Sequence, residues 1–417
     1  MVSNTRFITR ALVLAAMTVA GAVSAAPPAS MLGKKAAGFE DPNNWPQYHR
    51  SYNAWRYSPL KDINKNNVNK LKVAWIHQPG SITQGLQATP IVIDGVMYYI
   101  GPDNHVFALK ADSGEVIWRH TPKLNPVYKE SFYASQSRGV TVGRGKVFIG
   151  STDGRFIALD QATGKEVWST QLTNLKTEFG ALFTSPPQLA GDVLFGGASG
   201  GDQPMMGKIF AVNADTGERV WTFDVLKDDP KSWPGDSRKV GGGSAWLPGT
   251  YDPTTDTIYI GTSNASPDYD RADRIGDNLY TSSVLALEPK TGKLKWFRQE
   301  VPNDSWDFDS AYEALMVPDA SGAQSLVHLN KNGFVYVMDK DNGKLKNVWQ
   351  YAENVNWTKG VDPKTGVPIE PNYPVRGITK NHCPNILGGR NWNHGAYSPD
   401  TKLWYSTGME VCNNVTA

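Results

Sequence analysis

The chain has 417 residues, of which 40% are hydrophobic and 20% charged, the ordinary balance of a globular protein with a large core. A formal net charge of +2 provides no strong field, so the composition predicts no nucleic-acid partner. The 40 Gly and 27 Pro residues indicate a fold with many turns.

The first 25 residues have the pattern of a secretion signal. Arg6 and Arg10 form the positive end, residues 11–23 form an apolar stretch too short to span a bilayer, and a small-residue cleavage site ends at Ala25. A membrane anchor is the alternative interpretation, but no later stretch of about 18 apolar residues follows. We therefore expect 1–25 to be a signal peptide and 26–417 to be a secreted, periplasmic protein without a membrane span.

Short strands follow in chain order. A helical or loop segment covers 64–71, and Val73–Trp75 reads as a strand closing an edge blade. Alternating runs bounded by Asp-Gly or Thr-Gly turns then come in quartets, as is typical of antiparallel strands. The first quartet is 89–93, 96–101, 106–110 and 116–120, and the pattern returns within 139–169 and 185–223.

One phrase recurs five times: a small residue, a polar tetrad ending in Gly, and a hydrophobic stretch ending in Trp. The copies are 108–118, 158–168, 211–221, 286–296 and a degenerate 337–349. Their glycines are Gly114, Gly164, Gly217, Gly292 and Gly343, so the period is near 50 residues. Such a period, built from strands and tight turns, indicates an all-β propeller of four-stranded blades, with each Trp docking between neighbours.

Extra polar material interrupts this period at 227–244, 266–278 and 360–384, and such insertions form loops on one face, often the functional one. We count roughly six blades or partial blades. The chain ends soon after a strand-like run at 403–407, and no closing strand is visible. We therefore expect a propeller whose C-terminal blade or blades are missing.

Four groups of loop residues are unusual for a plain scaffold. Gly241–Trp246 offers close backbone approach and a flat indole face, although a tight turn with a core Trp reads equally well. Asn264 follows the strand 257–261 and is either a hard-cation ligand or a turn residue. Residues 303–309 hold three acids, which form a solvated loop unless a cation relieves their repulsion; Asp307 and Asp309 alternate and share a face on an extended segment.

The fourth group is a pair of cations near strand ends, Arg138 and Lys331, which either bind an anionic ligand or are ordinary surface charges. Cys383 and Cys412 are the only cysteines, and in an oxidising compartment a bridge is favoured over two buried thiols. No P-loop, dinucleotide fingerprint, zinc spacing, haem CxxCH or nucleophile elbow is present, which disfavours nicotinamide, zinc and serine-hydrolase chemistry.

Together these residues resemble the quinoprotein alcohol dehydrogenases, the methanol and ethanol dehydrogenase family that uses pyrroloquinoline quinone (PQQ). The likeness runs from Trp45 to about Asn413 and includes the Trp phrases and the motifs at 56–59, 276–281, 306–309 and 388–392. The resemblance implies an eight-bladed propeller, incomplete here, that binds PQQ together with Ca²⁺ or a lanthanide ion. A haem domain is not visible in the chain.

The family pattern also implies residue roles. Trp246 resembles the floor on which the quinone stacks; Asp307 resembles the catalytic base. The other implied cofactor contacts are Arg138, Thr184, Ser185, Ser244, Lys331, Asn391 and Trp392. The implied metal ligands are Asp202, Asn264, Asp307 and Asp309, with Asp309 matching the extra acid of the lanthanide-using branch, and Cys383–Cys412 matches a family disulfide.

The chain also departs from the family pattern. Asp202 stands where the family has a ligating glutamate, whereas Glu178 precedes its strand and is no substitute. Phe132-Tyr133 replaces two adjacent cysteines that cap the quinone in many members, and Gln87 replaces an acid near the quinone. These differences indicate a divergent subfamily whose substrate the sequence does not specify.

The expected function is metal-assisted hydride transfer from an alcohol to the quinone, with Asp307 as base and Lys331 stabilising charge on the quinone oxygen. The product is an aldehyde, and a periplasmic cytochrome c is the expected electron acceptor. The alternatives are a sugar or polyol dehydrogenase with the same cofactor and a non-enzymatic periplasmic propeller scaffold. Asp307, Asp309, Asn264 and Trp246 argue against the scaffold, which needs no acids in its channel.

Overall fold

The computed structural model describes residues 41–80, 86–131, 136–319 and 321–416. The expected signal peptide and the Phe132-Tyr133 replacement lie outside these ranges. Almost all regular structure is β-strand, and the helices are short 3-10 turns: η2 (Val68–Lys70), η3 (Pro102–Asn104), η4 (Pro126–Glu130) and η5 (Ser237–Val240). Among the described residues, none of the helices has the length and apolar character needed to cross a bilayer.

Five four-stranded antiparallel sheets follow one another along the chain. They are β1 (Ile91–Ile93), β2 (Val96–Ile100), β3 (Val106–Lys110), β4 (Val116–His120); β5 (Thr141–Gly143), β6 (Lys146–Gly150), β7 (Arg155–Asp160), β8 (Glu166–Gln171); β9 (Gln188–Ala190), β10 (Val193–Gly197), β11 (Lys208–Asn213), β12 (Arg219–Asp224); β13 (Thr250–Asp252), β14 (Thr257–Gly261), β15 (Ser283–Leu287), β16 (Leu294–Gln299); and β17 (Leu315–Pro318), β18 (Gln324–Leu329), β19 (Phe334–Asp339), β20 (Leu345–Gln350).

Two further pairs of strands follow: β21 (Ile378–His382) with β24 (Asn413–Thr416), and β22 (Ala396–Ser398) with β23 (Leu403–Tyr405). Five blades and the hairpin β22–β23 agree with the expectation of roughly six blades or partial blades. The disulfide Cys383–Cys412 is present, with the Cα atoms 4.6 Å apart, and it joins the end of β21 to the start of β24.

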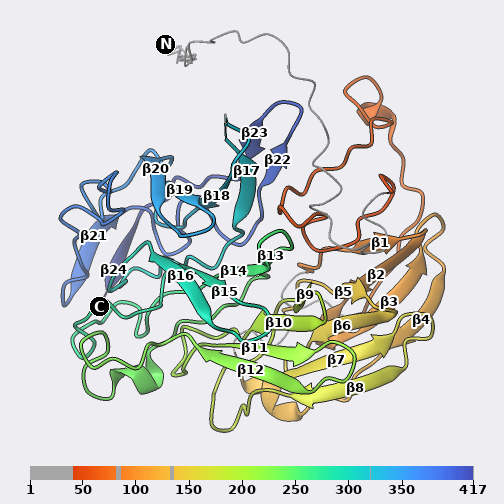
Figure 1. Cartoon of the computed structure of the whole chain (residues 1–417), viewed down its shortest axis with the longest axis horizontal. Coiled ribbons are helices and arrows are strands. Elements are labelled where there is room, and N and C mark those ends of the chain that lie inside the picture. Colours follow the sequence, from red (N-terminus) through yellow and green to blue (C-terminus); the bar gives the residue numbers. More distant parts are fainter. Residues whose placement is uncertain (1–40, 81–85, 132–135, 320, 417) are drawn as a thin grey trace, which may run out of the picture.

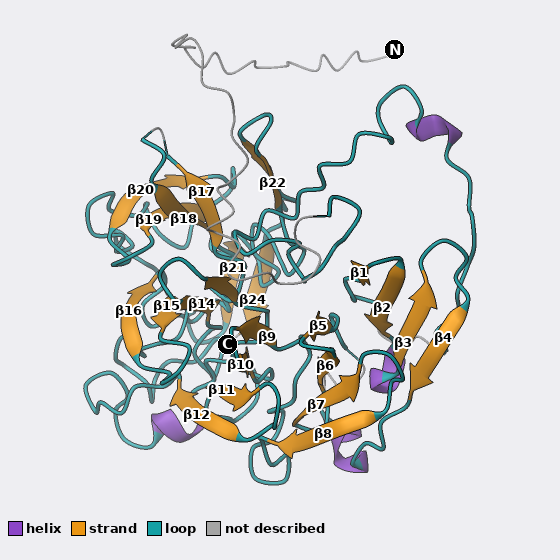
Figure 2. Cartoon of the chain, turned by 45° about the vertical axis from the view of Figure 1, so that its right-hand side comes forward, coloured by secondary structure: helices purple, strands orange, loops and turns teal. Residues whose placement is uncertain are grey.

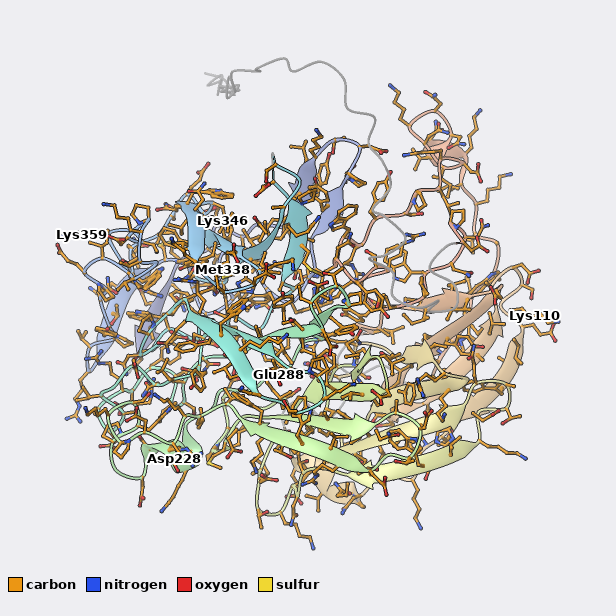
Figure 3. The ribbon with its side chains drawn as sticks, viewed as in Figure 1. Lys110, Asp228, Glu288, Met338, Lys346 and Lys359 are labelled. Atoms are coloured by element: carbon orange, nitrogen blue, oxygen red, sulfur yellow. A yellow bond between two sulfur atoms is a disulfide. The ribbon has the colours of Figure 1, made fainter. Side chains whose placement is uncertain are left out.

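The blades are arranged around an arc, with the first strand of each blade toward the middle and the fourth strand outside (Figures 1 and 2). Among the inner strands, β9 contacts both β5 and β13. The third strands β7 and β11 are mostly buried, whereas the fourth strands β8 and β12 are largely exposed. Met338 of β19 is fully buried, whereas Lys110 and Lys359 lie at opposite margins of the molecule (Figure 3).

The Trp-docking prediction is confirmed at the four junctions between successive described blades, but not for the fifth phrase, whose Trp349 is 45% exposed. Each indole lies against the turn glycine of the next blade, and its Nε1 donates to a carbonyl of the same turn. The pairs are Trp75 with Gly114, Trp118 with Gly164, Trp168 with Gly217, Trp221 with Gly292 and Trp296 with Gly343. All five glycines have φ between 69° and 77°, a conformation that a residue with a Cβ adopts at a cost.

The small residue that opens each phrase has a second role. The third and fourth strands of every blade shift register directly after it, as at Ala158 and Ala211, which are fully buried. Such bulges increase the local twist of the sheet. The apolar cores then form between neighbouring blades rather than within one, so that Ile91 of the first blade and Ile157 of the second belong to a single cluster.

One predicted strand is wrong. Residues 73–75 form no strand, and Val73 is 77% exposed, because no neighbouring backbone pairs with this segment in the described structure. Trp75 nevertheless docks on the first blade, so its indole alone carries out the expected edge-closing contact. At the other end of the series, Trp349 is 45% exposed.

Candidate active site

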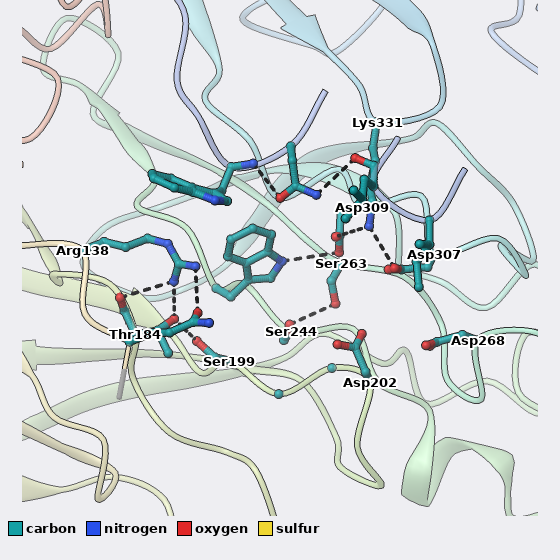
Figure 4. A pocket seen from close by; sticks show the side chains of 18 of the residues that line it. Arg138, Thr184, Ser199, Asp202, Ser244, Ser263, Asp268, Asp307, Asp309 and Lys331 are labelled. Atoms are coloured by element: carbon teal, nitrogen blue, oxygen red, sulfur yellow. Dashed lines mark hydrogen bonds and ion pairs between the residues drawn. The ribbon is translucent and has the colours of Figure 1, made fainter. Parts of the chain in front are cut away.

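A cavity of about 450 Å³ lies where loops from successive blades converge (Figure 4). The antiparallel topology explains the convergence, because the first strand of a blade begins at the same end of the sheet where the second strand ends. Its lining residues come from these two kinds of loop. They are Gln87, Gln136, Arg138, Thr184, Ser199, Gly200, Gly201, Asp202, Ser244, Trp246, Ser263, Asp268, Asp307, Asp309, Lys331, Ile386, Leu387, Asn391 and Trp392.

The acidic end of the cavity is organised around one ammonium group. Lys331 Nζ lies 3.0 Å from Asp307 Oδ2 and 3.2 Å from Asp309 Oδ2, and all three side chains are largely buried. Burial by itself lowers the pKa of Lys331, but the two carboxylates raise it well above its usual value, so the ammonium stays charged. Burial raises the pKa of Asp307 and of Asp309, and nearby carboxylates add to this. Two carboxylates thus share the single ammonium group of Lys331.

The third acid of this segment has a structural role. Asp304 accepts hydrogen bonds from the backbone N–H groups of Trp306 and Phe308, at 2.9 and 2.7 Å. These bonds fold the segment into a turn in which Asp307 has φ 62°, so the backbone there is not the extended segment that the alternation implied. Asp307 and Asp309 still reach the same ammonium, and Asp304 does not line the cavity.

Trp246 forms a wall of the cavity. The guanidinium carbon of Arg138 lies 4.8 Å from the indole centroid, and Arg138 also donates to Thr184 Oγ1 at 2.7 Å. The indole Nε1 lies 3.4 Å from Asp309 Oδ1. Ser185 does not line the cavity; its hydroxyl donates to the Trp246 carbonyl at 2.6 Å and so supports the wall from behind. Ser244 lies in the cavity wall, 3.0 Å from the Ser263 hydroxyl.

The glycine run before Trp246 serves loop packing. Gly242 has φ 75°, and a Cβ there would lie 2.7 Å from the Gly201 carbonyl oxygen. The run therefore brings the loop after β10 against the loop before β13, and Asp202 and Trp246 share one cavity as a result. Glu178 instead pairs with Lys208 and does not line the cavity.

Asn264 lies behind the acidic end. It is 1% exposed, its Nδ2 donates to Asp268 Oδ1 at 2.7 Å, and its Oδ1 accepts no hydrogen bond within the described residues. Gln87 Oε1 in the cavity wall is likewise buried without a donor among the described residues. Buried polar atoms are usually satisfied, so these two oxygen acceptors are available to a ligand or cation bound in the cavity.

Asn391 and Trp392 reach the cavity on a loop that is held by a buried ion pair. Arg390 contacts both oxygens of Glu313, at 3.1 and 3.0 Å, and both side chains are fully buried. His394 Nδ1 lies 2.9 Å from Glu313 Oε2, which adds a further partner to the carboxylate. Burial opposes ionisation of Glu313, yet Arg390 and His394 hold its pKa well below the usual value.

Most of the candidate residues named from the sequence therefore converge on one cavity; Ser185 and Asn264 lie directly behind its wall. Sequence reasoning missed Gln136, Ser199, Ser263, Asp268, Ile386 and Leu387. Asp268 lies in the polar insertion at 266–278, where no strand periodicity predicts the direction of a side chain. The insertion itself, however, had indicated a loop on the functional face. Among the described residues, no three His, Cys, Asp or Glu side chains are close enough together to hold a metal ion, so binding one requires the acids to draw together.

Residues 45–371 match the family model described as glucose/ethanol/alcohol dehydrogenase, β-propeller domain, of the PQQ type. The chain belongs to the PQQ-dependent alcohol dehydrogenase family. The resemblance found from the sequence motifs, and the propeller fold that it implied, are thereby confirmed.

Relatives in this family agree in sequence and in structure. The chain is 37% identical over 392 residues to quinohemoprotein alcohol dehydrogenase ADH IIB of Pseudomonas putida, covering 88% of this chain and 56% of the relative. It is 36% identical to a quinoprotein ethanol dehydrogenase of Pseudomonas putida, covering 86% and 66%. A europium-containing methanol dehydrogenase superposes with a TM-score of 0.85 at 32% identity, covering 90% of this chain and 70% of that one. The chain thus spans less than two thirds of the length of ADH IIB.

Proposed function

We propose that this protein is a periplasmic dehydrogenase that binds PQQ and a cation in the cavity and oxidises an alcohol to an aldehyde. The observation that carries the proposal is the meeting of Asp307, Asp309, Lys331, Trp246 and Arg138 in one cavity, from the loops of three blades. A volume of about 450 Å³ is within the range of sites for small ligands and cofactors. A plain scaffold has no need of buried acids around a lysine at this position.

The residues fit the quinone chemically. Trp246 offers an indole face to a planar ring, which stacks favourably on aromatic side chains. Arg138 supplies a fixed guanidinium for a carboxylate of the cofactor, because its hydrogen bond to Thr184 holds it in place. Asn391 and Trp392 are proposed to contact the quinone from the opposite loop, and Ser244 adds a hydroxyl. Ser185 is proposed to act through the Trp246 backbone.

The residues also supply the donor chemistry that a hard cation requires. Asp202, Asp307, Asp309 and Asn264 provide oxygen donors of the kind that Ca²⁺ and lanthanide ions prefer, and the Asn264 oxygen has no other partner in the described structure. Burial and mutual repulsion disfavour the ionised forms of Asp307 and Asp309, and a neighbouring cation would favour those ionised forms. Asp202 is one methylene shorter than the glutamate of the family pattern, so its loop must approach the ion more closely.

When bound, the quinone supplies a two-electron acceptor and the ion a Lewis acid. The chain supplies the remaining functions. Asp307 accepts the hydroxyl proton of the alcohol at its carboxylate oxygen. Lys331 holds positive charge beside that carboxylate and beside the cofactor, and Trp246 fixes the plane in which the cofactor lies. Electrons are proposed to leave to a periplasmic cytochrome c, and the N-terminal signal is proposed to direct secretion.

The test is dye-linked alcohol oxidation by protein loaded with PQQ and either La³⁺ or Ca²⁺. We expect Asp307→Asn to lower kcat by at least about a hundredfold, the usual worth of a positioned general base, while PQQ still binds. The control is Asp228→Asn, which makes the same chemical change at an exposed position on the rim of the molecule (Figure 3). Equal turnover of the Asp307→Asn protein and the control would refute the proposed base.

A further inference from the structure

Asp268 is an acid at the cation end of the cavity that the family motifs did not identify. It follows Asn264 by four residues, in the loop after β14, and its side chain lines the cavity. In Figure 4 its carboxylate points toward the space bordered by Asp202 and Asp307. Electrostatic interactions of Asp268 with Asp202, and of Asp307 with both, confirm that these groups are near one another.

The Asp268 carboxylate determines how the Asn264 amide is oriented. Asn264 Nδ2 donates to Asp268 Oδ1 at 2.7 Å, so the amide nitrogen is occupied. The amide oxygen accepts no hydrogen bond within the described residues, and the side chain is 1% exposed. With the nitrogen bound in this way, the oxygen is left as the atom of that side chain able to ligate a hard cation.

Asp268 also adds to the charge at this end of the cavity. Lys331 contacts Asp307 and Asp309, and the buried Arg274 interacts electrostatically with Asp268. Four cavity-lining aspartates, when ionised around a cation, outnumber Lys331 and Arg274, and a trivalent ion neutralises that excess of negative charge better than a divalent one.

We infer that Asp268 belongs to the cation site: it orients the Asn264 oxygen toward the ion, and its charge favours a trivalent over a divalent cation. This inference rests on the proposed function, which requires a cation there. The Coulomb energy of one removed charge scales with the charge of the ion. Each tenfold loss of Ca²⁺ affinity on neutralising Asp268 therefore corresponds to about a thirtyfold loss of Tb³⁺ affinity.

The experiment measures Tb³⁺ binding by sensitised luminescence and Ca²⁺ binding by calorimetry, on the full chain with PQQ present. Four proteins are compared: wild type, Asp268→Asn, Asp268→Ala and Asp273→Asn. Asp268→Asn removes the charge and keeps an oxygen acceptor for Asn264, whereas Asp268→Ala removes both. Asp273→Asn is the matched control, since Asp273 is an exposed acid of the same loop.

We expect Asp268→Asn to weaken Tb³⁺ binding at least tenfold and to lower the Tb³⁺-to-Ca²⁺ affinity ratio. Asp268→Ala should weaken both ions further, and Asp273→Asn should match wild type. If both Asp268 variants bind Tb³⁺ and Ca²⁺ with wild-type affinity, the inference is wrong whatever their alcohol preference, and the proposed function still stands. A wild-type protein that binds neither ion would instead overturn the proposed cation site itself.

Discussion

The docking of each Trp on the next blade predicts a sharp difference between two glycine substitutions in one blade. Gly164 and Gly145 both have φ 70°, in the β7–β8 and β5–β6 turns respectively. A Cβ at Gly164 would lie 2.5 Å from Trp118 Cε3, whereas a Cβ at Gly145 meets no atom within 4 Å. The two Gly→Ala variants therefore share the backbone cost and differ in the contact with the docked indole.

The magnitudes follow from these contacts. Alanine in a left-handed conformation costs about 1 kcal/mol, partly offset because it restricts the unfolded chain, and this applies equally to both variants. Gly164→Ala must in addition displace an indole that is 9% exposed and donates to the Gln161 carbonyl at 3.1 Å. Overpacking of that kind costs about 1–3 kcal/mol. We expect Gly164→Ala to lower the free energy of unfolding by about 2 kcal/mol more than Gly145→Ala.

Urea denaturation followed by circular dichroism measures this difference as a shift of the unfolding midpoint. A second comparison isolates the indole. In a Trp118→Ala background the clash at Gly164 is absent, so the added cost of Gly164→Ala should fall to that of Gly145→Ala. Equal destabilisation by the two glycine variants in the wild-type background would refute the docking argument.

Two further predictions concern buried titratable groups near the site. Glu313→Gln leaves the Arg390 guanidinium buried without its carboxylate and should cost about 3–5 kcal/mol of unfolding free energy; Glu115→Gln, which breaks an exposed pair, should leave the urea midpoint unchanged. Burial lowers the pKa of His382 to about 4, below its unfolded value of about 6.5, so stability is full above pH 6.5 and is lost as the pH falls toward 4. His382→Phe, which keeps a ring against Trp306, should therefore show a smaller loss of the urea midpoint between pH 7 and pH 4.5 than wild type; an equal loss would contradict this assignment.

The repeat made most of the fold predictable from the sequence. A period near 50 residues with Gly and Trp at fixed places requires the same turn and the same interblade contact each time, and those contacts are present from Gly114 to Gly343. The strand at 73–75 failed because the docking contact of Trp75 depends on its indole and requires no paired backbone.

The site was predictable where a residue stands next to a strand end. Trp246 precedes β13, Lys331 follows β18, and antiparallel topology brings such loops to one end of the fold. The roles of Asp268 and Asp304 could not be predicted from the sequence, for opposite reasons. Asp268 lies in an irregular insertion that only tertiary contacts direct into the cavity. Asp304 stands in an acidic motif, but its oxygens accept hydrogen bonds from backbone N–H groups.

We propose above all that one cavity holds a flat quinone against Trp246 beside a cation. Equilibrium dialysis of PQQ against wild type, Trp246→Ala and the exposed-Trp control Trp349→Ala, each with and without La³⁺, tests it most directly. We predict one PQQ per chain, tighter binding with La³⁺, and at least about a tenfold loss in Trp246→Ala alone. A PQQ affinity that is unchanged both by La³⁺ and by the loss of the Trp246 indole would contradict this proposal.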